Sequence, residues 1–122
     1  MLLTSRTQYR VRIWSIAMKR YILVDLNDTE TFDTLDEAKQ RMDEWIDDAR
    51  QNFIDSRQTA SEEQIARWNA EEDFYAQRDD IAGQIRLYEI DLDVYEGDKD
   101  WPDEELNGCE RIETFEYRQF RD

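Results

Sequence analysis

The chain has 122 residues, with 31 acidic against 16 basic side chains and no histidine, and its net charge is −15 at pH 7. Such a chain should repel nucleic acid and anionic membranes and should attract basic surfaces. Apolar residues make up 39% of it and aromatic residues 12%, which indicates a folded domain rather than a disordered acidic tail. A single cysteine excludes an internal disulfide and a cysteine-based metal cluster.

Residues 1–17 differ from the rest of the chain because they carry three arginines and no acid. Within them, Tyr9, Val11 and Ile13 alternate with polar residues, a period typical of a half-exposed strand. The sequence that follows starts with methionine and resembles the start of an ordinary bacterial protein. Residues 1–17 are therefore either an edge strand or an extension from an upstream start codon, and we expect residues 18–122 to form a single acidic domain.

Short alternating segments on both sides of a long central stretch predict strands. Residues 21–26 form the clearest one, and Thr31 and Phe32 are expected to return beside it as a short hairpin arm. Residues 86–95 form the second clear strand and residues 111–120 the last one. The side chains of the second strand that should face the core are Tyr88, Ile90, Leu92 and Val94.

The central stretch, residues 34–82, is rich in helix formers and contains no glycine and no proline. Its apolar residues recur at steps of three and four, which places them on one face of a helix. Thr34 followed by Glu37 predicts a capping box, in which both side chains satisfy free backbone N–H groups at a helix start. Gly83, directly after the stretch, suits a left-handed helix cap.

A second helix start lies inside this stretch. It is signalled either by Thr59 with Glu62 or by Ser61 with Gln64. Two start signals separated by one helix length favour a helical hairpin that turns near residues 56–60. The rival is one helix of about 48 residues, which is unusual against a mean length near 12.

Taken together, the elements predict an α+β fold in which a small antiparallel sheet of three to four strands packs against the helical hairpin. The last two strands are joined by an acidic loop, residues 97–108, that ends in a turn-forming Asn-Gly pair. The residues expected to form the core are Ile22, Val24, Met42, Trp45, Ala49, Ile65, Trp68, Ile90, Leu92 and Phe115.

The inventory of side chains argues against catalysis. Histidine, the usual general base, is missing, and no nucleophile elbow or glycine-rich phosphate loop occurs. Asp25 to Asp36 has the oxygen spacing of a calcium loop, but Glu30 stands where that loop needs glycine. Cys109 has no evident activating partner and is read as a structural or exposed thiol. We therefore expect no enzyme, no cofactor and no metal site.

The carboxylate pattern is the most informative feature. Glu89, Asp91 and Asp93 alternate along the second strand and should project from one face about 6.6 Å apart. Duplex DNA carries one charge about every 3.4 Å along each strand, so this spacing matches every second phosphate. The carboxylates expected to bind a partner are Asp43, Glu44, Asp47, Asp48, Asp55, Glu71, Glu72, Asp73, Glu89, Asp91 and Asp93.

Two readings of these carboxylates stay open, a nucleic-acid decoy and a solvated face that keeps the protein soluble. The net charge of −15 lies well beyond the magnitude of about 2–8 that solubility requires. Excess like charge also destabilises the compact state. This cost favours a functional role for the charge. The role that fits best is binding to a groove lined with lysine and arginine.

In size, acidity, lack of histidine and α+β layout, the chain resembles the small acidic inhibitors that phages make against host defences. These include antirestriction and anti-CRISPR proteins, several of which resemble DNA in charge. The resemblance implies a non-enzymatic inhibitor that binds the nucleic-acid-binding surface of a host defence complex. We expect a monomer or homodimer in the bacterial cytoplasm that contacts neither nucleic acid nor membranes directly. The alternatives are an immunity- or antitoxin-like protein that neutralises one basic enzyme, and an accessory protein whose acidity is incidental.

Overall fold

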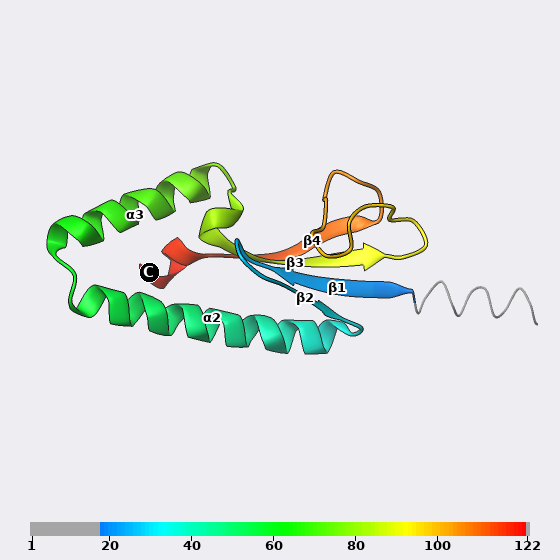
Figure 1. Cartoon of the computed structure of the whole chain (residues 1–122), viewed down its shortest axis with the longest axis horizontal. Helices are drawn as coiled ribbons and strands as arrows, with labels where there is room; N and C mark the ends of the chain where they lie inside the picture. The colour runs from blue at the N-terminus through cyan, green and yellow to red at the C-terminus, as the bar shows by residue number, and fades with distance from the viewer. Residues whose placement is uncertain (1–17, 122) are drawn as a thin grey trace, which may run out of the picture.

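A computed structural model describes residues 18–121 of the chain (Figure 1). The segment 1–17, expected as an edge strand or an extension, lies outside the described residues. The four strands pair antiparallel in the order β2-β1-β3-β4. Together with two α-helices they confirm the α+β class. The elements are β1 (Lys19–Val24), β2 (Thr29–Phe32), α2 (Leu35–Gln58), α3 (Glu62–Gln77), the 3-10 turn η1 (Ile81–Gly83), β3 (Gln84–Asp91), β4 (Cys109–Glu116) and the 3-10 turn η2 (Tyr117–Arg121).

Both faces of the sheet carry buried residues, and β1 and β3 are its two central strands. On one face, Leu23 and Leu87 pack against Met42 of α2. On the other face, Ile22 and Ile90 pack beneath the segment that joins β3 to β4. A strand that is covered on both faces has buried side chains on both. The predicted alternation of residues 86–95 identified the face that carries Tyr88 and Ile90, and it missed the second buried face, which carries Ile85 and Leu87.

Several strand ends differ from their predicted positions because side chains cap the turns. β1 ends at Val24, because the Asp25 carboxylate accepts the N–H groups of Asn27 and Asp28 at 2.8 Å, and Leu26 is exposed. β3 ends at Asp91, whose carboxylate accepts the Asp93 N–H at 3.0 Å. Val94, expected to face the core, is therefore exposed beyond the strand end.

The central stretch forms two helices, as the start signals favoured. Thr34 accepts the Glu37 N–H at 3.3 Å at the start of α2. At the start of α3, Ser61 and Gln64 form the reciprocal capping box, with bonds of 3.1 and 3.3 Å, which decides between the two candidate caps. α3 ends at Gln77 rather than at residue 82.

The hairpin is open, and only α2 lies on the sheet (Figure 1). α3 has no buried residue and is held mainly by η1 and η2. Ile65 and Trp68 are thus half-buried rather than core residues, which corrects the sequence prediction. Trp45, Ala49, Leu92 and Phe115 pack partly buried around the core.

The C-terminal segment fills part of the space between the two helices (Figure 1). β4 ends at Glu116, where residues 111–120 were expected to continue as one strand, and η2 follows it. Phe120 of η2 lies 5.4 Å from Phe53 of α2 and 4.9 Å from Phe115, measured between ring centroids. An irregularity in the pairing of β3 with β4 shifts the register between Leu87 and Tyr88. The turn and the register shift together explain the imperfect alternation of this segment.

Candidate acidic interface

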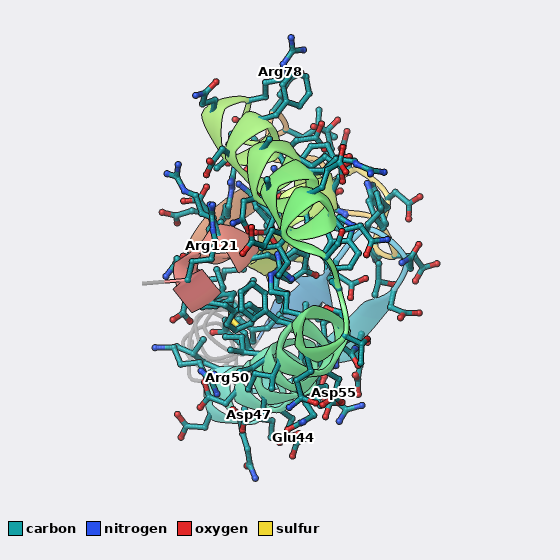
Figure 2. The ribbon with its side chains drawn as sticks, turned by 90° about the vertical axis from the view of Figure 1, so that its left-hand side faces the viewer. Glu44, Asp47, Arg50, Asp55, Arg78 and Arg121 are labelled. Carbon is teal, nitrogen blue, oxygen red and sulfur yellow. The ribbon has the colours of Figure 1, made fainter. Side chains whose placement is uncertain are left out.

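The first group of predicted carboxylates lies on the exposed side of α2. Asp43, Glu44, Asp47, Asp48 and Asp55 are all exposed. They form two neighbouring pairs, at 43–44 and 47–48, with Asp55 two turns further on, and they lie opposite the apolar stripe that includes Met42. Figure 2 shows Glu44, Asp47 and Asp55 on the side of α2 that points away from α3. From residue 43 to residue 55 the row spans about 18 Å of helix.

Two arginines offset part of the charge of this row. Arg41 bonds to Glu44 at 2.6 Å and to Glu30 of β2 at 2.9 Å, and these bonds raise the pKa of the Arg41 guanidinium. Arg50 bonds to Asp47 at 2.7 Å. All of these groups are solvated, so each pair contributes little to stability. Asp43 and Asp48 pair with no cation in the described part of the chain.

The predicted carboxylates of α3 divide into two kinds. Glu71 is exposed, whereas Glu72 and Asp73 pair with arginines of α2 and η2, of which Figure 2 labels Arg121. Arg57 of α2 approaches Glu72 to 3.3 Å, and the hydrogen bond from Arg121 lowers the pKa of Asp73. Glu72 and Asp73 therefore tie η2 and α2 to α3 and are not brought together with the row on α2.

The carboxylates of β3 do not form the expected row. Glu89 is paired with Lys19 of β1 at 2.8 Å, a bond that raises the pKa of Lys19. Asp91 caps the turn that follows the strand, and Asp93 lies beyond the strand end. The regular spacing of about 6.6 Å, which requires three strand positions, is therefore absent from this strand. This prediction was wrong because β3 ends two residues too early.

A charged network that the sequence analysis missed joins the turn after α3, β4 and the segment between β3 and β4. Arg111 of β4 bonds to both carboxylate oxygens of Asp79, at 2.8 and 2.6 Å, and to both of Glu104, at 2.9 and 2.8 Å. These bonds lower the pKa of both carboxyl groups. Gln84, a buried polar residue, donates to Asp79 at 2.7 Å. No local sequence signal links these positions, because 32 residues separate Asp79 from Arg111.

Three further features of the described residues concern metal ions, membrane-spanning helices and the cysteine. Within residues 18–121, no group of three or more carboxylate or cysteine side chains is arranged to hold a metal ion. No helix in that range has the length and apolar character needed to cross a membrane. Cys109 is buried, and burial raises the pKa of its thiol to about 11, so little of it is ionised near neutral pH. Searches against family models, curated proteins and solved structures found no match to this chain.

Proposed function

We propose that the protein is a non-enzymatic inhibitor that acts in the cytoplasm of a bacterial host. In this proposal it binds the positively charged nucleic-acid-binding surface of a defence complex of the CRISPR or restriction type. The carboxylates of α2 take the place of phosphates, so the protein acts as a nucleic-acid decoy. The observation that carries the proposal is the exposed row on α2, because it is the one predicted acidic group whose members share a free surface.

The support of α2 makes the row a rigid one. Met42 and Ala38 are buried against the sheet. Their packing sets the orientation of α2, so that the side with the carboxylates faces the solvent. Residues three or four apart on a helix rise by about 4.5–6 Å, close to the separation of every second phosphate along DNA, about 6.8 Å. A basic groove that accepts a phosphate backbone can therefore meet several of these carboxylates at once.

The charge of the row is also larger than solvation needs. Neighbours of like charge four residues apart, such as Asp43 with Asp47 and Glu44 with Asp48, destabilise a helix by a few tenths of a kcal/mol each. Only Arg41 and Arg50 offset them among the described side chains. Binding to a basic partner would remove this repulsion, which favours a partner over a merely solvated face.

Neutral variants test the proposal. The first variant, D43N/D47N/D48N, removes three charges from the row on α2. The matched control, E96Q/E110Q/E113Q, removes three exposed charges that make no ion pair with any described residue and belong to β4 and the segment before it rather than to α2. The partner is captured from a bacterial lysate with the natural protein, purified, and titrated with both variants by calorimetry.

We expect the row variant to bind roughly 3- to 150-fold more weakly, at about 0.2–1 kcal/mol for each lost charge contact. The control should change the dissociation constant less than 3-fold. Equal losses in both variants would mean that bulk charge alone matters, and the decoy proposal would fail. A captured partner that is a single toxin or nuclease without a guide or restriction subunit would favour the immunity-like alternative.

A further inference from the structure

The acidic segment between β3 and β4, residues 92–108, has a defined shape. Tyr95 is buried, and its hydroxyl donates to the Asp98 carbonyl at 2.7 Å and accepts the Asp103 N–H at 3.1 Å. Gly108 has a φ of +84°, and a Cβ atom there would lie 2.8 Å from the Tyr95 backbone nitrogen. A long segment fixed around one buried hydroxyl is typical of functional loops.

This segment and β3 line an open pocket of about 500 Å³. Arg86 and Tyr88 of β3 line it, together with Trp101 and Leu106 of the segment. Trp101 is 44% exposed and Leu106 is 42% exposed. Tryptophan on a fixed surface is the residue type that most often dominates protein interfaces, and neither of these side chains belongs to the core.

The free charge of the pocket is negative. The two arginines next to it, Arg86 and Arg111, are held in the network with Asp79 and Glu104, so these four charges offset one another. Three further carboxylates line the pocket and make no ion pair with any residue in the described range. They are Asp98, Asp103 and Glu105.

From this arrangement we propose that the pocket is a second interaction surface, which takes an arginine side chain from a protein partner. The guanidinium would stack on Trp101 and pair with these three carboxylates, of which Asp98 and Asp103 also accept backbone N–H groups of the segment. Arginine fits better than lysine because its planar, forked group both stacks on an aromatic face and bonds two carboxylate oxygens. The 92–108 segment, which lines the pocket, and α2 lie on opposite faces of the sheet (Figure 1), so this surface goes beyond the decoy row and can bind independently of it.

A peptide titration followed by NMR tests this surface without the defence complex. The probe is a blocked peptide with three arginines separated by glycines, and its lysine counterpart is the control probe. The indole N–H signal of Trp101 is assigned from its loss in W101F. With the arginine peptide we expect saturable shifts of this signal and of the Asp103 and Glu105 amides, and binding about 2- to 5-fold tighter than with the lysine peptide.

Matched variants separate a pocket from bulk attraction. We expect W101L to weaken arginine-peptide binding about 3-fold or more. D103N/E105Q should weaken it more than D47N/D48N, which removes the same charge from α2. Equal weakening by both pairs, or shifts centred on α2, would overturn the proposal. Because Trp101 and the two acids are exposed, each variant should keep the remaining NMR signals in place. These outcomes are independent of the calorimetric test, so failure of one proposal is distinguishable from failure of the other.

Discussion

Replacing Arg111 with methionine should destabilise the fold by removing the centre of the charged network. The change deletes the four hydrogen bonds that Arg111 donates to Asp79 and Glu104 and keeps an aliphatic chain of similar length. These bonds hold together three parts of the chain that are distant in sequence, the end of α3, the 92–108 segment and β4. The loss should therefore appear as global destabilisation and not as local fraying.

The magnitude follows from the exposure of the partners. The side chain of Arg111 is 18% exposed, that of Asp79 56% and that of Glu104 38%. An exposed pair contributes at most about 1 kcal/mol, whereas removing one partner of a buried pair costs about 3–5 kcal/mol. For this partly solvated network we expect a loss of about 2 kcal/mol, which lowers the melting temperature of a domain this size by roughly 8–16 °C.

The pH dependence gives a second readout of the same network. Hydrogen bonds from Arg111 lower the pKa values of Asp79 and Glu104 in the folded protein. The stabilisation is therefore complete above the unfolded pKa values of roughly 4 and is lost as the pH falls below them toward the lower folded values.

The assay is urea unfolding followed by circular dichroism at pH 7 and at steps down to pH 3. R111M should be less stable than the natural protein at pH 7, and the difference should shrink as the pH falls. R118M is the control, because the Arg118 side chain is well exposed and forms its ion pair within the described residues with Glu116 alone, at 3.5 Å. Equal stability of R111M and the natural protein at pH 7, or parallel pH curves, would refute the reasoning.

Two further predictions concern the helices. M42A should lower the free energy of unfolding by about 2–5 kcal/mol, because Met42 is buried between α2 and the sheet. I65A should lower it by less than about 1 kcal/mol, because α3 has no buried residue. Equal losses in urea unfolding would contradict the open hairpin. R57K keeps the charge that faces Glu72 but loses the guanidinium plane, which lies 5.4 Å from the ring centroid of Trp68 in α3. Amides of α3 should therefore exchange about 5-fold faster, at about 1 kcal/mol for this contact, and unchanged exchange would contradict the role of Arg57.

The features that local chemistry determines could be predicted from the sequence. The helix starts at Thr34 and near Ser61 follow from side chains that bond to backbone groups three residues away. The exposed row on α2 follows from the helical period, which puts its carboxylates opposite the apolar stripe. The α+β class follows from two strands on each side of a glycine-free helical stretch.

The features that depend on distant partners could not be predicted. The half-burial of Trp68 depends on the angle at which α3 leaves α2, and the apolar period of a helix carries no information on that angle. Asp73 is tied up by Arg121, 48 residues away, and Glu89 by Lys19, 70 residues away. A single sequence does not indicate whether a distant arginine or lysine will pair with a given carboxylate. The predicted site therefore included Asp73 and Glu89, whose ion pairs stabilise the fold.

The central claim, that the carboxylates of α2 take the place of phosphates on a basic surface, is tested most directly by competition. The captured partner is bound to fluorescently labelled duplex DNA, and the protein is added while anisotropy is followed at 0.05, 0.15 and 0.5 M salt. The account predicts that one equivalent of protein releases the DNA at low salt, and that its affinity falls steeply as salt rises because screening shortens the reach of charge attraction to about 10 Å at 0.1 M. Release should fail with D43N/D47N/D48N. Binding of the protein while the DNA stays bound, with an affinity that salt does not change, would contradict the account.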